Sequence, residues 1–133
     1  MGMFSTAREK LDAPDVLLVD DSDTTAQCVQ EYLALLGYSV ARARNAHEAW
    51  VIFEEACPRA VVTDSNMPGE PFPEESGLRL ARRIKHLSPH TPVIMLAGLP
   101  PTGASAACDY VLSKPTPLRQ LVELLARMGI TPH

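Results

Sequence analysis

Residues 16–22, which read VLLVDDS, decide the fold of this chain of 133 residues. The first four are aliphatic and two of them are β-branched, which is typical of a strand buried on both faces. Such strands occur in parallel sheets that carry helices on either side. Two aspartates follow at once, so Asp20 and Asp21 are expected at the edge of the sheet where this strand ends.

Four further strands are predicted along the chain. Three are short apolar runs at residues 60–62, 93–96 and 110–112, and the fourth, at 38–43, includes polar residues and is typical of an edge strand. Helical patterns separate the strands, which implies right-handed βαβ units. We therefore predict an α/β fold with a doubly wound, five-stranded parallel sheet in the order 2-1-3-4-5, as in flavodoxin-like proteins.

The helices are predicted from apolar residues at helical spacing. Their inward faces should consist of Ala26, Val29, Leu33 and Leu36, then Ala49, Ile52, Phe53 and Ala56, then Ala81 and Ile84, and last Leu118, Leu121, Val122 and Leu125. Gly37 and Gly129 should end the first and last helices, and Asn45 and Thr116 should cap the second and last at their starts. The third helix should expose four basic residues, which are Arg79, Arg82, Arg83 and Lys85. They are interpreted as a solvated face, with contact to a partner or to the acidic residues at 70–75 as the less favoured alternative.

Two segments interrupt the alternation of strands and helices. Residues 68–76 (PGEPFPEES) form an acidic, proline-rich loop, and residues 98–109 (GLPPTGASAACD) stand where a fourth helix is due. Proline and glycine both oppose a full-length helix. The fourth helix should therefore be short or irregular.

The composition fits one ordinary globular domain. Hydrophobic residues make up 46% of the chain and charged residues 21%, which excludes disorder, collagen and coiled coil as descriptions of the whole. We predict a domain at residues 15–129, with a leader at 1–14 and a tail at 130–133. So short a tail leaves no room for an output domain, and we expect a regulator that stands alone.

Charge and cysteine content bound the partners and the compartment. The net charge is −4 and no apolar run reaches the ~20 residues of a membrane span, so neither nucleic acid nor a membrane is an expected partner. Cys28, Cys57 and Cys108 lack the spacing of a zinc site and are interpreted as packing residues. The absence of a secretory signal predicts a cytoplasmic protein.

Charged residues follow three of the predicted strands. Asp20 and Asp21 follow the first, Asp64 ends the third, and Lys114 follows the fifth. Because strands one and three are neighbours and their carboxyl ends share an edge, the aspartates should converge. Three carboxylates repel one another, and Mg²⁺ is the cation that suits such an oxygen-rich site. With the lysine they describe a site for a phosphoryl group, where one carboxylate could become the nucleophile and form an aspartyl phosphate.

Four stretches resemble the receiver domain of two-component response regulators, which has a CheY-like fold of five βα units. They are VLLVDDS at 16–22, VVTDSNMPG at 61–69, PVIML at 92–96 and VLSKP at 111–115. The resemblance implies that Asp64 accepts a phosphoryl group from a histidine kinase or a histidine phosphotransfer protein. It also implies that Lys114 contacts this group and that the bond between Lys114 and Pro115 is cis.

The resemblance assigns the metal site and the partners as well. Asp21 would bind Mg²⁺ directly, Asp20 would act through water, and Asp64 and the backbone carbonyl of Asn66 would complete the site. The phosphorylated chain would signal through contacts with an unidentified downstream protein. A second copy of the chain is a further candidate partner.

The chain departs from this family at two switch positions. Ala97 stands where the family usually has Thr or Ser at the end of the fourth strand, and Val111 stands where it often has Tyr or Phe. Tyr110, one place earlier, should face the other side of the strand. The loop after Asp64 is longer than is usual and the fourth helix shorter. We therefore expect that the residues of the phosphoryl site keep their chemistry, whereas the usual coupling of this site to an output surface is altered.

Two other interpretations stay open. Because Ala97 has no hydroxyl, the chain could be a pseudo-receiver that binds partners without phosphate. Residues 21–25 (DSDTT) also match DxDxT, the nucleophile motif of haloacid-dehalogenase-like phosphatases, with Asp21 as the nucleophile. Those enzymes place an acidic pair after the lysine, whereas Glu123 is the one acidic residue that follows Lys114 here.

Overall fold

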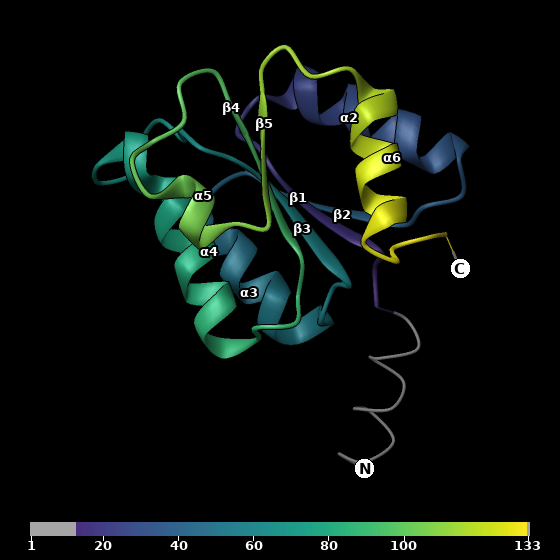
Figure 1. The fold of residues 1–133 in the computed structure, drawn as a ribbon, viewed down its shortest axis with the longest axis horizontal. Helices are drawn as coiled ribbons and strands as arrows, with labels where there is room; N and C mark the ends of the chain where they lie inside the picture. Colours follow the sequence, from purple (N-terminus) through teal and green to yellow (C-terminus); the bar gives the residue numbers. More distant parts are fainter. Residues whose placement is uncertain (1–12, 133) are drawn as a thin grey trace.

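The chain forms a five-stranded parallel sheet with helices on both faces (Figure 1). The computed structural model describes residues 13–132. The strand order β2-β1-β3-β4-β5 confirms the predicted fold class. The strands are β1 (Val16–Val19), β2 (Val40–Ala43), β3 (Ala60–Asp64), β4 (Val93–Ala97) and β5 (Tyr110–Ser113).

The three central strands place the acidic residues side by side. Every residue of β1, β3 and β4 is buried, because each strand has a neighbour on both sides and helices above and below. Val19 lies opposite Thr63 in the register of β1 and β3. Asp20 and Asp64 are therefore the next residues along two neighbouring strands.

Five α-helices flank the sheet within the described residues. They are α2 (Asp23–Leu35), α3 (Ala46–Ala56), α4 (Ser76–Leu87), α5 (Ala104–Ala107) and α6 (Leu118–Arg127). Helices α2 and α6 cover one face of the sheet, and α3, α4 and α5 cover the other (Figure 1). Each face has its own core, with Leu33 and Leu121 in the first and Phe53 and Ile84 in the second.

Helix ends follow local chemistry, with two corrections to the sequence analysis. Asn45 caps α3 as predicted, because its side chain accepts a 2.8 Å hydrogen bond from the Glu48 amide. Thr116 does not cap α6: Pro117 occupies the N-cap position, and the Thr116 hydroxyl donates to the carbonyl of Ser113 at 2.6 Å. Leu36 was expected inside but is 45% exposed, because α2 has already ended there.

The two irregular segments both adopt defined structure. The loop at 68–76 contains a 3₁₀ turn, η1 (Pro73–Glu75), directly before α4. In the other segment α5 is a single turn of four residues, which confirms the short fourth helix. These segments flank the edge of the sheet where β3 and β4 end.

Both ends of the described chain pack against the sheet domain. The Arg59 amide donates to the carbonyl of Pro14, and the Tyr38 hydroxyl donates to the carbonyl of Ile130 at 2.8 Å. Most of the leader predicted at 1–14 lies outside the described residues, and the domain limits at 15 and 129 stay a prediction. No helix of residues 13–132 is long and apolar enough to cross a membrane.

Candidate functional site

Three carboxylates meet at the carboxyl edge of β1 and β3. Asp20 and Asp21 follow β1, and Asp64 is the last residue of β3. One carboxylate oxygen from each residue lies within 4.8 Å of the others. Asp20 and Asp64 are buried, whereas Asp21 is exposed. The convergence predicted from the strand order is therefore present, with one member open to solvent.

Asp20 accepts hydrogen bonds at both its carboxylate and its backbone carbonyl. Burial raises its pKa above the ordinary 3.8, a hydrogen bond from the Ser22 amide opposes this, and the negative charge of Asp64 adds to it. The Ser22 bond is 2.9 Å long, and Arg42 donates to the backbone carbonyl of Asp20 through Nε and Nη2. Burial and the neighbouring carboxylates both disfavour the charged form of Asp20, and a cation bound beside it would favour that form.

We expect Asp20→Asn to stabilise the protein at neutral pH in a metal chelator. Since folding raises the pKa of Asp20, the folded state binds more protons at this residue than the unfolded state between pH 3.8 and the folded-state pKa. Stability therefore falls as pH rises through the folded-state pKa, and the variant escapes this loss. Urea titrations from pH 4 to pH 7 should show a higher midpoint for the variant at pH 7 and convergence at the acidic end. A variant that is less stable than the wild type at pH 7 would contradict the electrostatic explanation.

Asp64 is paired with Lys114, which the chain brings from 50 residues away. Lys114 Nζ donates to Asp64 Oδ1 at 2.9 Å, and the Asn66 amide lies 3.5 Å from the same oxygen. The peptide bond between Lys114 and Pro115 is cis. The Lys114 amide donates to the carbonyl of Ala97, which ties the start of this turn to β4. One positive group, Lys114, and two negative groups, Asp20 and Asp21, thus surround the Asp64 carboxylate.

Helix α4 begins in direct contact with the end of β3. The Gly77 amide donates to the carbonyl of Ser65 at 3.1 Å. A Cβ atom at Gly77 would lie only 2.1 Å from the carbonyl oxygen of Asp64. Only glycine permits this approach, so the start of α4 fixes the backbone of Asp64.

A cavity of about 470 Å³ opens above these residues. It is lined by Asp21, Asp64, Ser65, Asn66, Pro68, Glu74, Gly98, Leu99 and Lys114. Glu74 and Leu99 line this cavity although neither was predicted as a site residue. The length and acidity of the loop after Asp64 were the available signal for Glu74, whereas nothing in the sequence distinguished Leu99.

The two switch positions contain no polar group that could reach the cavity. Ala97 is fully buried at the end of β4. Val111 is partly buried and packs on the core beneath α4 and α5. Tyr110 lines a different cavity with α6 residues such as Glu123 and Arg127, so it faces the opposite side of β5. The structure therefore shows no hydroxyl or aromatic ring from these positions at the site.

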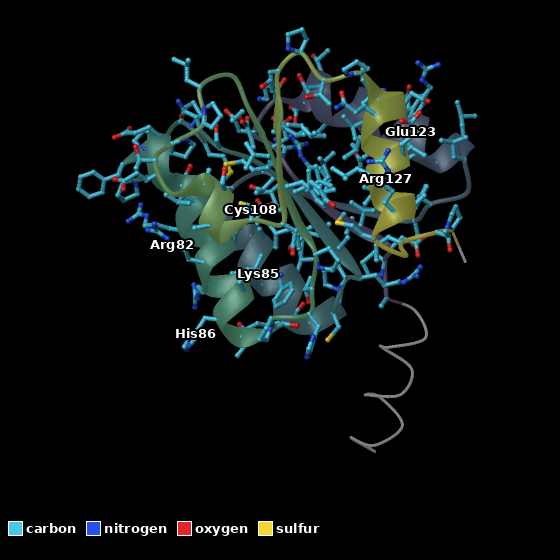
Figure 2. All side chains as sticks on the ribbon, viewed as in Figure 1. Arg82, Lys85, His86, Cys108, Glu123 and Arg127 are labelled. Atoms are coloured by element: carbon cyan, nitrogen blue, oxygen red, sulfur yellow. The ribbon has the colours of Figure 1, made fainter. Side chains whose placement is uncertain are left out.

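The basic residues of α4 do not form a uniformly solvated face. Arg82 and His86 lie on the outer side of α4, away from α6 with Glu123 and Arg127 (Figure 2). Arg83, by contrast, stacks over the Trp50 ring at 3.8 Å, and Arg79 lies 5.6 Å from the Phe72 ring centroid. Arg79 also donates to the carbonyl of Pro71. Lys85 is half-buried and pairs with Asp109 at 2.9 Å. The interpretation of this face as purely solvated is thus wrong for Arg79, Arg83 and Lys85.

The cysteines are not a reactive centre of this site. Cys108 is buried, and burial raises the pKa of its thiol to about 11, so it stays protonated near neutral pH. Cys28 and Cys57 are exposed, which corrects their interpretation as packing residues. None of the three lines the cavity above Asp64.

The fold and the site together define a CheY-like domain with an acidic pocket at its carboxyl edge. The family model of the response regulator receiver domain matches residues 16–126, and the chain belongs to this family. Asp23, the second acid of the phosphatase-like motif, pairs instead with Arg42 at 2.8 Å and Arg44 at 3.4 Å. It takes no part in the carboxylate group.

Curated relatives contain a similar domain within longer chains. Autoinducer 1 sensor kinase/phosphatase LuxN of Vibrio campbellii is 32% identical over 120 residues, which cover 85% of this chain and 13% of LuxN. Response regulator MprA of a Mycobacterium species is 31% identical over 118 residues, which cover 85% of this chain and 48% of MprA. The chain therefore spans less than half the length of these relatives.

Solved structures of receivers share the fold over nearly their whole length. A response regulator receiver domain protein from Clostridium thermocellum has a TM-score of 0.75 at 28% identity, and covers 85% of this chain and 91% of its own. Response regulator protein TrrA from Thermotoga maritima, solved in complex with Mg²⁺-BeF, has a TM-score of 0.75 at 27% identity. The match covers 85% of this chain and 96% of the TrrA chain.

Proposed function

We propose that the chain is a phospho-accepting receiver whose acceptor is Asp64 and whose donor is a histidine kinase or a histidine phosphotransfer protein. The observation that carries this proposal is the pairing of Asp64 with Lys114 at 2.9 Å, inside a group of three carboxylates that opens into a cavity. Family membership supports the same chemistry.

In the proposed reaction a carboxylate oxygen of Asp64 attacks the phosphorus of a phosphohistidine. The bond from phosphorus to the histidine nitrogen breaks, its electron pair stays on the imidazole, and an aspartyl phosphate remains. Lys114 lies close enough to neutralise charge on the phosphoryl oxygens, which is where catalysis of this transfer acts. The 2.9 Å bond from Lys114 also holds the Asp64 carboxylate at the edge of the cavity.

The donor set at the site fits Mg²⁺. Asp20, Asp21, Asp64 and the backbone carbonyl of Asn66 would hold the ion, because hard oxygen ligands suit it and the crowded carboxylates need a counter-charge. When bound, Mg²⁺ supplies positive charge to the oxygens of the phosphoryl group. The complex of the related TrrA protein with Mg²⁺-BeF supports this choice of metal.

Signalling is proposed to occur in the cytoplasm through contacts with a downstream protein. Nucleic acid and membranes are not proposed partners, because the chain is acidic overall. The relatives LuxN and MprA contain a similar domain within longer chains, of which this chain spans 13% and 48%. Self-association is a further proposal that sedimentation of the phosphorylated protein would test.

Incubation with acetyl phosphate and Mg²⁺ tests the acceptor assignment. We expect intact-mass spectrometry to show one added phosphate, and borohydride trapping with peptide mapping to place it on Asp64. Asp64→Ala should take up none, whereas Asp23→Ala, a nearby exposed aspartate, should behave like the wild type. A label on Asp21 would instead favour the phosphatase chemistry of the DxDxT motif.

A phosphate-independent pseudo-receiver is the second candidate function. The observation that favours it is Ala97, a buried residue with no hydroxyl to bind a phosphoryl oxygen. A hydrogen bond to a charged group contributes about 1.5–3 kcal/mol, so its absence weakens the coupling of phosphate to conformation. Absence of any uptake in the acetyl phosphate experiment would select this alternative.

A further inference from the structure

The loop at 68–76 contributes its own carboxylate to the cavity above Asp64. Glu74, the central residue of η1, lines this cavity with Asp64, Asn66 and Lys114. Asp64 and Asp20 have hydrogen-bond donors for their carboxylates, but Glu74 makes no hydrogen bond or ion pair with another residue of 13–132. Glu74 is thus an unpaired acidic residue at the cavity into which a phosphoryl group on Asp64 would extend.

The C-terminal part of the loop, at Pro73 and Ser76, is hydrogen-bonded to the backbone just after Asp64. The Ser76 hydroxyl donates to the carbonyl of Pro73 at 2.7 Å and accepts from the Met67 amide at 3.0 Å. The Met67 amide also lies 3.2 Å from the Pro73 carbonyl. The turn that bears Glu74 is therefore bonded to a residue only three positions from Asp64.

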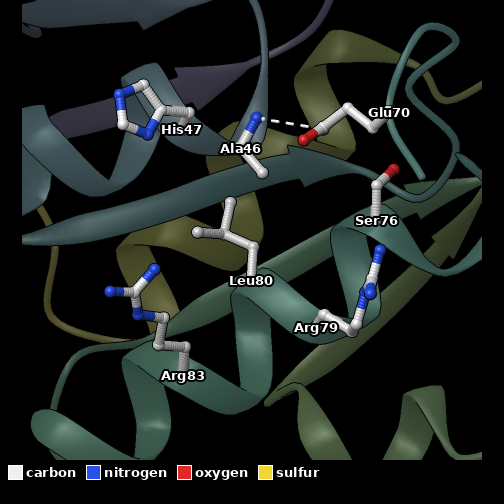
Figure 3. Close-up of a pocket in the computed structure, with 7 residues that line it drawn as sticks. All are labelled: Ala46, His47, Glu70, Ser76, Arg79, Leu80 and Arg83. Atoms are coloured by element: carbon white, nitrogen blue, oxygen red, sulfur yellow. Dashed lines mark hydrogen bonds between the residues drawn. The ribbon is translucent and has the colours of Figure 1, made fainter. Parts of the chain in front are cut away.

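The earlier part of the loop, at residues 70–72, contacts α3 and α4, and Figure 3 shows the bond between Glu70 and Ala46. Glu70 Oε2 accepts a 3.1 Å hydrogen bond from the Ala46 amide, the first residue of α3, where a negative charge is favourable. Arg79 donates to the Pro71 carbonyl and contacts the Phe72 ring. Because the loop is bonded at both ends, Glu74 has a defined place at the cavity.

We propose that Glu74 is the general base for hydrolysis of the aspartyl phosphate and so limits the lifetime of the phosphorylated state. This inference rests on the proposed function of Asp64. The oxygen of a water molecule attacks phosphorus, and the bond from phosphorus to the Asp64 oxygen breaks with its electron pair returning to the carboxylate. One proton of the water passes to Glu74 and then to solvent, and the other leaves with inorganic phosphate. A positioned base can contribute about 10²–10⁴-fold to such a step.

The test compares phosphate loss from the wild type, Glu74→Gln and Glu75→Gln. Glu75 is the matched control, because it is a neighbouring exposed carboxylate of the same turn that does not line the cavity. After loading with acetyl phosphate and removal of the donor, we expect Glu74→Gln to retain phosphate at least about tenfold longer than the wild type. Glu75→Gln should decay at the wild-type rate.

Beryllium fluoride separates a role in hydrolysis from simple repulsion. This compound imitates the phosphoryl group but does not hydrolyse, so a base for water should leave its affinity within about twofold. Glu74→Gln could instead lengthen the lifetime of the phosphate and raise the affinity for beryllium fluoride by the same factor. That result would show that Glu74 merely repels the anion, and would overturn the inference. An unchanged lifetime in Glu74→Gln would overturn it too. Failure of the wild type to take up phosphate would instead overturn the proposed function, and the inference with it.

Discussion

Gly77→Ala should reduce the free energy of unfolding by at least about 3 kcal/mol, which is the upper part of the range for overpacked sites. The added Cβ would lie 2.1 Å from the Asp64 carbonyl oxygen and 2.8 Å from the Ser65 Cα. Both neighbours are backbone atoms in a buried segment, so neither can rotate away. The gain of about 1 kcal/mol in helix propensity from glycine to alanine is smaller than this cost.

Gly98→Ala is the matched control for this prediction. Gly98 follows β4 on the same edge of the sheet, and a Cβ there would meet no atom within 4 Å. Its substitution should change stability by no more than about 0.5 kcal/mol. Urea unfolding followed by circular dichroism would measure both variants. A midpoint for Gly77→Ala equal to that of the wild type would show that α4 can move away from β3.

The fold was predictable because the chain repeats one signal. Apolar runs such as 16–19 and 60–62 predict buried strands, and the segments between them have apolar residues at helical spacing. Alternating strands and helices of this kind predict a parallel sheet with helices on both faces. The errors occurred at helix ends. Thr116 resembles an N-cap in sequence, but the following proline shifts the helix start by one residue, and the hydroxyl binds Ser113 instead.

The site was predictable only where residues follow strands directly. Strand order alone places Asp20 next to Asp64, because the carboxyl ends of neighbouring parallel strands meet. Glu74 could not be placed in this way, since its position depends on bonds that a loop makes at both ends. Those bonds involve the Met67 and Ala46 amides, and backbone amides carry no sequence signal.

The contact between Arg79 and the loop was predicted only as the less favoured alternative, for a similar reason. A run of arginines on a helix usually faces water, and its spacing does not reveal a neighbour that lies earlier in the chain. The structure shows the Arg79 guanidinium against Phe72 and the Pro71 carbonyl. The residues at the edge of the sheet could therefore be predicted from local sequence pattern, whereas the residues that cover this edge depend on tertiary contacts.

Asp21→Asn should weaken Mg²⁺ binding by at least about tenfold, which corresponds to about 1.4 kcal/mol. The substitution removes one of three negative charges whose oxygens lie within 4.8 Å of one another. At an effective dielectric constant near 20, each unit of charge about 4 Å from another contributes about 4 kcal/mol, so a tenfold loss is a lower bound. Asp21 is the exposed member of the group, and its removal leaves the buried hydrogen bonds of Asp20 and Asp64 intact.

Asp23→Asn separates this effect from a general loss of negative charge. Asp23 is two residues further on and exposed, and it already pairs with Arg42 and Arg44, which lower its pKa. Titration of Mg²⁺ monitored by amide chemical shifts should give Asp23→Asn an affinity within about twofold of the wild type, because its charge is neutralised locally. Equal weakening in both variants would mean that the ion responds only to net charge. Unchanged binding in Asp21→Asn would mean that the ion is held elsewhere than at the convergence of β1 and β3.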